Sequence, residues 1–306
     1  MANLTILGAG AWGSALAILA QKNGHQVNLW SRSSSWNLES VLTDTDVLVS
    51  AVSMKGVAAT IELVMSGRLS ASAAIVTATK GLDAATTRTP AQIWHDAFPQ
   101  HSIVVLSGPN LSQEIVQGLP TATVAASIDL EAAKRVQDIY SSETFRVYIN
   151  SDPLGTELGG TLKNVFAIAA GVCDGLQLGI NAKSALLTRA LPEMIRVGVR
   201  LGAQVETFYG LSGLGDLLAT CNSSLSRNYR VGFGLAQGKS LEQVLEELHS
   251  TAEGVNTTNV LIDLAKKQDI EVPVSTQVYR LINSKITPEQ AVAALMERTV
   301  KPEKSI

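Results

Sequence analysis

The sequence contains few aromatic residues and no block of charge of one sign. Aromatic residues make up 5% of the chain although 46% is hydrophobic, so its apolar content is mostly Ala, Leu, Val and Ile. Such residues suit helices packed on a parallel sheet. The formal net charge of −3 argues against a nucleic-acid-binding surface. A local basic site for a small anion is still compatible with this charge.

Cysteine and histidine are too sparse for a disulfide framework or a metal centre. Cys173 and Cys221 lie in runs predicted to be buried, which indicates a reducing compartment and hence the cytoplasm. The four histidines show no metal-ligand spacing: His25, His95, His101 and His249. We therefore expect no metal site.

No uncharged apolar run is long enough to cross a membrane. Even residues 162–179 include Lys163, Asn164 and Asp174. The N-terminus lacks the basic start and the small-residue cleavage site of a signal peptide. We therefore expect no membrane insertion.

Short apolar runs and helical patterns alternate along the first half of the chain. This alternation predicts a Rossmann-like, doubly wound and mostly parallel sheet with helices on both faces. From Asp152, a helix N-cap followed by Pro153 at the first helical position, helical patterns continue almost to the end. The sequence thus predicts a dinucleotide-binding domain over residues 1–150 and an all-helical substrate and catalytic domain over residues 151–306.

The turn after the first strand has the pattern G-x-G-x-x-G, formed by Gly8, Gly10 and Gly13. Between a strand and a helix, this pattern predicts a pyrophosphate site at the helix N-terminus, with a tight turn without ligand as the alternative. The acidic residue that usually ends the second strand is missing, and Arg32 stands among serines. An arginine there accommodates a 2′-phosphate, so we expect NADP to be preferred over NAD. A solvated loop arginine is the competing interpretation.

Polar residues also follow two later strands. Lys80 in ATKGL, and Gly108 and Asn110 in SGPN, come directly after apolar runs. Ligands of open parallel sheets bind at the carboxyl ends of the strands. We therefore expect these residues to meet an anionic substrate or the cofactor, although Lys80 could also be a surface lysine on a turn.

Lys163 and Asn164 stand in a helical pattern of Gly, Ala and branched apolar residues. Burial lowers the pKa of a lysine and makes it a usable acid or base, whereas a lysine at the helix edge would merely reach solvent. Asp216 follows three glycines in GLSGLGD, which predicts a tight backbone path that delivers a carboxylate.

The stretch SRN predicts a phosphate site. Ser226 is a candidate N-cap, with Arg227 and Asn228 in the first helical turn. A cap hydroxyl, a guanidinium and free backbone N–H groups together bind phosphate. The alternative is an ordinary capped helix with a solvent-facing arginine.

In chain order, GAGAWGSALA, ATKGL, SGPN, ELGGTLKNVFAIAAG, GLSGLGDLLAT, SRN and the pair Glu253–Gly254 resemble the bacterial NAD(P)-dependent glycerol-3-phosphate dehydrogenases. That family interconverts dihydroxyacetone phosphate and sn-glycerol 3-phosphate for phospholipid synthesis. The resemblance implies that Lys163 exchanges a proton with the C2 oxygen, oriented by Asp216 and Asn164. It implies substrate contacts from Lys80, Gly108, Asn110, Lys163, Asp216, Ser226, Arg227 and Asn228. It implies dinucleotide contacts from Gly8, Gly10, Ala11, Trp12, Gly13, Arg32, Lys80, Ser112, Arg227 and Glu253.

The segment 31–46 is shorter than the family's usual one, so we expect a helix or strand to be absent beside the adenosine end of the site. Two other functions stay open: a related reductase of a non-phosphorylated hydroxy acid, and a non-catalytic nucleotide-sensing protein. The SRN stretch argues against the first, and the presence of both Lys163 and Asp216 against the second. We expect a small phosphorylated substrate, and a homodimer is left open.

Overall fold

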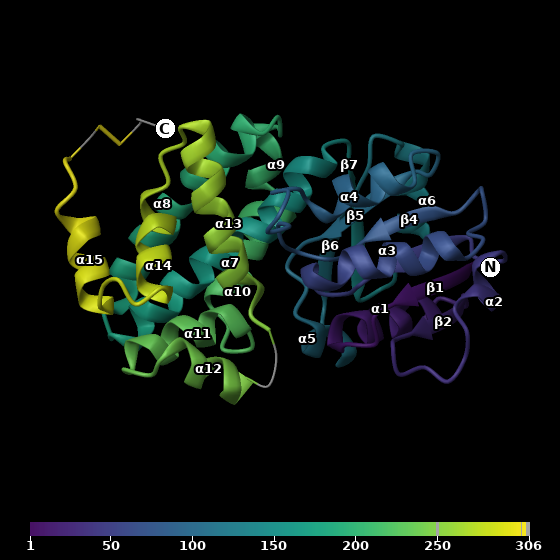
Figure 1. Ribbon diagram of the computed structural model, residues 1–306, viewed down its shortest axis with the longest axis horizontal. Coiled ribbons are helices and arrows are strands. Elements are labelled where there is room, and N and C mark those ends of the chain that lie inside the picture. The colour runs from purple at the N-terminus through teal and green to yellow at the C-terminus, as the bar shows by residue number, and fades with distance from the viewer. Residues whose placement is uncertain (249–250, 301, 304–306) are drawn as a thin grey trace. The chain divides into compact units, whose positions relative to one another are not determined.

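The computed structural model describes residues 1–248, 251–300 and 302–303, and its chain divides into two compact units. The first unit contains Met1–Asp83 and Arg88–Glu157. The second contains the short segment Ala84–Thr87 and the chain from Leu158 onward. The helices and strands of both units are labelled in Figure 1.

The first unit is built on a seven-stranded sheet of order β2-β1-β3-β4-β5-β6-β7. Its strands are β1 (Asn3–Leu7), β2 (Gln26–Trp30), β3 (Val47–Ser50), β4 (Ala74–Thr77), β5 (Ile103–Ser107), β6 (Thr121–Ala126) and β7 (Phe145–Asn150). Neighbouring strands are parallel except β5 and β6, which are antiparallel. The mostly parallel, Rossmann-like sheet predicted from the alternating pattern is therefore confirmed.

Helices cover both faces of this sheet. They are α1 (Ala11–Lys22), α2 (Glu39–Leu42), α3 (Val57–Ser66), α4 (Pro90–Ala97), α5 (Ser112–Val116) and α6 (Leu130–Tyr140), with a 3₁₀ turn, η1 (Met54–Gly56), before α3. Successive strand side chains point to opposite faces. Val47 and Val49 accordingly lie in the apolar cluster that includes α1 and α6, whereas Leu48 lies in the cluster with α3 and α4.

The described part of the second unit consists of helices and turns. The helices are α7 (Pro153–Gly175), which belongs to this unit from Leu158 onward, α8 (Gly179–Arg200), α9 (Val205–Tyr209), α10 (Asp216–Cys221), α11 (Arg227–Ala236), α12 (Leu241–Leu248), α13 (Glu253–Gln268), α14 (Pro273–Ile282) and α15 (Pro288–Met296). A π-helical turn, η2 (Leu211–Gly215), joins α9 to α10. The predicted helical C-terminal domain is confirmed. None of the described helices is both long and apolar enough for a membrane span.

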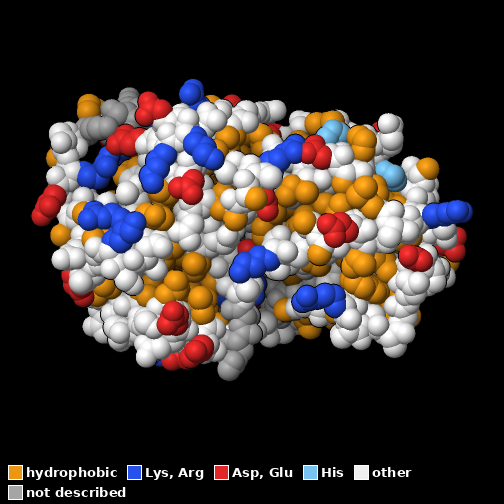
Figure 2. Space-filling view, viewed as in Figure 1, with side chains coloured by type: hydrophobic (Ala, Val, Ile, Leu, Met, Phe, Trp, Pro, Cys, Tyr) orange, Lys and Arg blue, Asp and Glu red, His pale blue; other side chains and the backbone are white. Residues whose placement is uncertain are grey.

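Two glycine contacts set the packing of α7 against α11. A Cβ on Gly171 would lie 2.0 Å from the carbonyl oxygen of Tyr229, and one on Gly232 would lie 1.8 Å from that of Ile168. Real Cβ atoms do not approach this closely, so only glycine allows the two backbones to touch. On the face drawn in Figure 2, acidic and basic side chains are interspersed among apolar ones.

Candidate active site

The glycine turn leads from β1 into α1. Gly8 has φ +110°, which favours glycine, and its N–H donates to the carbonyl oxygen of Trp30 at 2.8 Å. A Cβ on Gly13 would lie 1.9 Å from the Gly8 oxygen, whereas one on Gly10 would face open space. No side chain caps α1, which begins at Ala11. The turn therefore leaves helix N–H groups and an open approach for an anion.

Arg32 lies in an exposed serine loop after β2. The loop is held by hydrogen bonds among its serines, including Ser31 N–H to Ser34 Oγ at 2.9 Å and Ser31 Oγ with Ser33 Oγ at 3.0 Å. Arg32 forms no hydrogen bond or ion pair with any residue that the structure describes. Its guanidinium is thus available to a ligand in this first unit. Between β2 and β3 the loop contains one short helix, α2.

The structure brings Lys80, Gly108 and Asn110 together beyond the carboxyl ends of β4 and β5. Lys80 is half-buried and its Nζ donates to the Gly108 oxygen at 3.2 Å. Asn110 is fixed to β6, because its Nδ2 donates to the Ala122 oxygen at 3.3 Å and its Oδ1 accepts from Thr123 Oγ1 at 2.9 Å. Ser112 follows at the start of α5.

In the second unit, Lys163 and Asp216 form a buried ion pair. Lys163 is 7% exposed and Asp216 1% exposed. The Lys163 Nζ donates to Asp216 Oδ1 at 2.7 Å and to Thr220 Oγ1 at 2.6 Å, and Thr220 Oγ1 donates to Asp216 Oδ1 at 3.1 Å. A buried charge is costly unless it is paired and hydrogen-bonded, so this network holds the ammonium in a fixed orientation.

Thr220 was not predicted as a site residue from the sequence, although its spacing from Asp216 indicated it. Asp216 and Thr220 are four residues apart in α10, and residues at this spacing lie on one face of a helix. Thr220, whose hydroxyl lies on the same helix face as the Asp216 carboxylate, could therefore have been added to the predicted site.

Two glycines bring the carboxylate to Lys163. A Cβ on Gly213 would lie 2.1 Å from the Phe208 oxygen, so the π turn before Asp216 can close only around glycine. A Cβ on Gly159, four residues before Lys163, would lie 2.6 Å from the Ser212 oxygen. Because α7 rests directly on this turn, Lys163 and Asp216 reach each other from separate elements.

The first turn of α11 begins at Arg227. Ser226 caps it, accepting from the Tyr229 N–H at 3.2 Å. Arg227 is exposed, and the structure shows no partner for it in the described chain. Asn228 is buried, and its Oδ1 accepts from the Gly254 N–H at 2.9 Å. Asn228 thus ties α11 to the start of α13, where Glu253 is half-buried.

Asn164 lies beside this contact. It is 5% exposed, and a Cβ on Gly254 would lie 2.6 Å from its backbone oxygen. Within the described chain its side chain forms no hydrogen bond with Lys163. The structure therefore gathers Asn164, Asn228 and Gly254 into one cluster and Lys163, Asp216 and Thr220 into another.

The two cysteines are free and buried. Burial raises the pKa of Cys221 to about 12, and it also raises the pKa of Cys173. Thiolates, not thiols, are the nucleophiles, so neither residue is set up for nucleophilic chemistry. Within the residues searched, no group of three or more His, Cys, Asp and Glu side chains could hold a metal ion; His249 lies outside the described residues.

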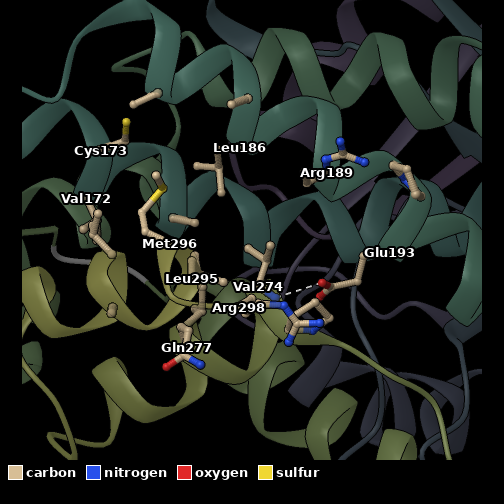
Figure 3. A pocket seen from close by; sticks show the side chains of 18 of the residues that line it. Val172, Cys173, Leu186, Arg189, Glu193, Val274, Gln277, Leu295, Met296 and Arg298 are labelled. Carbon is tan, nitrogen blue, oxygen red and sulfur yellow. Dashed lines mark hydrogen bonds between the residues drawn. The ribbon is translucent and has the colours of Figure 1, made fainter. Parts of the chain in front are cut away.

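A separate cavity of about 550 Å³ opens in the second unit (Figure 3). Its walls come from α7, α8, α14, α15 and the segment after α15, and are mostly apolar. Its buried carboxylate, Glu193, accepts from the N–H groups of Val274 and Ser275, both at 2.9 Å, and from Ser275 Oγ at 2.6 Å. Glu193 therefore serves as a cap for α14. None of the predicted site residues lines this cavity.

A Rossmann-like unit with an open glycine turn, followed by helices that bury a lysine–carboxylate pair, is the architecture of a two-domain dinucleotide-dependent dehydrogenase. Family models narrow this class. The model of the NAD-dependent glycerol-3-phosphate dehydrogenase C-terminus matches residues 152–293, and that of the N-terminus matches residues 3–37 and 33–133. The chain belongs to the NAD-dependent glycerol-3-phosphate dehydrogenase family.

Individual relatives agree with this assignment. The chain is 60% identical to the glycerol-3-phosphate dehydrogenase (NAD(P)+) of Acaryochloris marina, over 98% of this chain and 97% of that one. It is also 60% identical to that of Synechocystis sp., over 98% and 95% of the two chains.

Solved structures agree as well. The crystal structure of glycerol-3-phosphate dehydrogenase from Coxiella burnetii superposes with a TM-score of 0.93 at 34% identity, covering 97% of this chain and 99% of that one. A D-mandelate dehydrogenase in complex with NADH superposes with a TM-score of 0.58 at 12% identity, covering 94% and 99%, which shows a shared fold alone.

Proposed function

We propose that the protein interconverts dihydroxyacetone phosphate and sn-glycerol 3-phosphate, using NADPH or NADH in the reducing direction, and so supplies glycerophospholipid synthesis. Family membership supports the reaction. The observation that carries the mechanism is the buried network of Lys163, Asp216 and Thr220.

Lys163 is the general acid. During reduction, negative charge develops on the C2 oxygen of the substrate, and a positioned ammonium both stabilises that charge and delivers a proton. Asp216 and Thr220 hold the Lys163 Nζ from two directions, at 2.7 and 2.6 Å. This preorganisation removes the cost of orienting the lysine at the moment of reaction. Asn164, the next residue on α7, forms no hydrogen bond with Lys163 in the described chain, so we assign the orientation of the ammonium to Asp216 and Thr220.

The first turn of α11 binds the substrate phosphate. Ser226, Arg227 and Asn228 supply a capped helix start, a guanidinium and a residue that fixes the turn to α13. The phosphate is remote from C2, so its binding energy serves to position the reacting carbon. Lys80, Gly108 and Asn110 of the first unit also contact the substrate, and Lys80 contacts the cofactor.

Residues 1–150 hold the dinucleotide and residues 151–306 supply the catalytic groups. The turn of Gly8, Gly10 and Gly13 fits a pyrophosphate, because α1 is uncapped and the Gly10 approach is open. The reduced nicotinamide, when bound, supplies the hydride. Arg32 pairs with a 2′-phosphate, so NADP is preferred over NAD. The remaining dinucleotide contacts are Ala11, Trp12, Ser112, Arg227 and Glu253.

A steady-state assay tests this function. Oxidation of NADPH and of NADH is followed with dihydroxyacetone phosphate and, as the matched control, with unphosphorylated dihydroxyacetone. The proposal expects rapid turnover with the phosphorylated substrate alone. Equal turnover of both substrates would favour the reductase of a non-phosphorylated compound, and cofactor binding without turnover would favour a nucleotide-sensing protein.

The protein acts in the cytoplasm without membrane insertion, and a homodimer is left open. Two buried free cysteines support a reducing compartment. Light scattering of the purified protein measures the oligomeric state, and fractionation of cells measures the location. Recovery with the membranes would contradict the assigned location.

A further inference from the structure

The second unit contains a second ion pair, outside the groups assigned to proton transfer, in which the Lys183 side chain is buried and that of Asp174 is 31% exposed. Lys183, in the first turns of α8, donates from Nζ to Asp174 Oδ2 at 2.6 Å. Tyr229 Oη donates to the same oxygen at 2.6 Å. The Lys183 side chain is 10% exposed and its Nζ lies 5.4 Å from the centre of the Tyr229 ring. Three helices, α7, α8 and α11, therefore meet at one carboxylate.

Tyr229 is held at both its backbone and its side chain. Its N–H donates to Ser226 Oγ, the cap of α11, while its hydroxyl donates to Asp174 on α7. Burial and the neighbouring Asp174 raise the pKa of Tyr229, so the phenol keeps its proton and remains a donor. This one residue ties the capped turn of α11 to α7.

The packing of α7 against α11 requires an additional restraint on the rotation of α11. The two helices touch through backbone atoms at Gly171 and Gly232. Helix pairs are usually held at their crossing angle by side-chain ridges that fit into grooves. Where glycines replace the ridge, α11 has fewer side chains to prevent its rotation, and the bond from Tyr229 to Asp174 supplies the restraint.

This restraint connects the two halves of the proposed chemistry. Lys163 and Asp174 are both on α7, and a separation of eleven residues corresponds to about 16 Å along a helix. Arg227 stands two residues before Tyr229 on α11. Because α7 is one continuous helix, the bond from Asp174 fixes the Arg227 turn in relation to the Lys163 ammonium.

We propose that Asp174, Lys183 and Tyr229 are positioning residues, which hold the phosphate-binding turn of α11 at the correct place for proton transfer by Lys163. Lys183 neutralises Asp174 and restrains its carboxylate, and Tyr229 transmits the restraint to α11. The inference rests on the proposed function, because it takes Arg227 as the phosphate anchor.

The test is Tyr229→Phe, which removes one hydroxyl and leaves the ring in place. We expect the KM for dihydroxyacetone phosphate to rise about tenfold, as for one lost hydrogen bond to a charged group. The inhibition constant of inorganic phosphate rises by the same factor, and kcat falls too, because a substrate held by a displaced turn is misplaced against Lys163. Tyr279→Phe is the matched control, because among the bonds shown the Tyr279 hydroxyl accepts only from Lys285 Nζ, at 3.3 Å and in an exposed position. The KM of this control variant for dihydroxyacetone phosphate stays unchanged.

A double-mutant cycle with Arg227→Ala shows whether the effect passes through the arginine. If Tyr229 positions Arg227, Tyr229→Phe raises KM no further once Arg227 is removed. Asp174→Asn, which keeps an oxygen acceptor, changes KM less than Asp174→Ala. A lower melting temperature with unchanged KM and phosphate inhibition, or additive effects in the cycle, would overturn the inference. Failure of the proposed function itself would already be visible in the wild type, as absent turnover of dihydroxyacetone phosphate.

Discussion

Two glycine turns in this chain lead into helices. One leaves the helix N-terminus open, and the other places a carboxylate at the helix start. The turn of Gly8, Gly10 and Gly13 precedes α1, whose first turn contains no acidic residue and whose N-terminus has no side-chain cap. The turn η2 precedes α10, whose first residue is Asp216. The first turn leaves room for an external anion, whereas the second delivers an internal carboxylate to a lysine.

The two turns rely on the same steric device. A Cβ on Gly13 would lie 1.9 Å from the Gly8 oxygen, and one on Gly213 would lie 2.1 Å from the Phe208 oxygen. In both, glycine permits a close backbone contact that any side chain would prevent. The residue at the helix start, not the glycine itself, then decides whether the turn binds a ligand or supplies a side chain. A glycine motif can therefore be interpreted only together with the residues that follow it.

The largest expected effect is at the second turn. Lys163→Ala should lower kcat by roughly 10²–10⁴, the usual range for loss of a general acid. The dissociation constant of NADPH, which depends on the first turn, should barely change. The measurements are steady-state kinetics and fluorescence titration of NADPH, with the exposed Lys267→Ala as control. Near-normal turnover of the Lys163 variant would remove this lysine from the mechanism.

The buried carboxyl of Glu157 contrasts with that of Asp216, which is paired with Lys163. Glu157 accepts from the Ala91 N–H at 2.9 Å but meets no cation among the described residues, and burial raises its pKa from 4.5 to about 7. The folded state therefore retains this proton longer than the unfolded state does. Its contribution to stability is full below pH 4.5 and is lost as the pH rises through 7, a change of about 3 kcal/mol.

Glu157→Gln should remove this dependence. Denaturant unfolding of both proteins at pH 4.5 and pH 8 gives the two free energies of unfolding. The wild type should lose about 3 kcal/mol more than the variant across this interval. Parallel pH dependences would mean that Glu157 does not titrate in this range.

Arg227→Ala tests phosphate binding at α11, which lies outside both glycine turns. Loss of a charge-assisted contact should raise the KM for dihydroxyacetone phosphate by the equivalent of about 2–3 kcal/mol. Free phosphate should inhibit the wild type competitively and the variant poorly. Exposed Arg200→Ala on α8 is a suitable control. An unchanged KM in the Arg227 variant would exclude this arginine as the anchor.

Gly10→Ala tests the openness of the first turn. A Cβ there meets no protein atom within 4 Å, so the melting temperature should hold, while the methyl group crowds an approaching pyrophosphate. We expect NADPH to bind about tenfold more weakly, as for an overpacking cost of about 1–2 kcal/mol. Gly215→Ala, whose Cβ would be 3.7 Å from its nearest neighbour, is the matched control in the second turn. Equal NADPH affinity in both variants would place the pyrophosphate elsewhere.

The smallest expected effect is at Arg32. This side chain is exposed, and solvent screens its attraction for a 2′-phosphate. Arg32→Asp should reverse the cofactor preference by adding repulsion for NADPH and an acceptor for the ribose of NADH, each a change of about fivefold. The measurement is the ratio of kcat/KM for NADPH to that for NADH. Identical ratios in wild type and variant would show that cofactor choice depends on other residues.

Local patterns were sufficient for the fold class and for the family. The strand NLTIL, the glycine turn and the helix after it follow from spacing within about twenty residues, and the structure forms β1 and α1 there. The change from alternating elements to continuous helix near Asp152 is equally local. These features depend on backbone preferences and hydrophobic periodicity, which a sequence displays directly.

Contacts between distant residues were decided only by the tertiary structure. The pairing of Lys163 with Asp216 spans 53 residues, that of Tyr229 with Asp174 spans 55, and that of Asn228 with Gly254 spans 26. Spacing does not reveal which glycine lets two backbones touch, nor that β6 runs antiparallel to β5. The sequence by itself determined which residues could do chemistry. Packing decided which of them meet, because a buried charge is stable only where the fold brings it a partner.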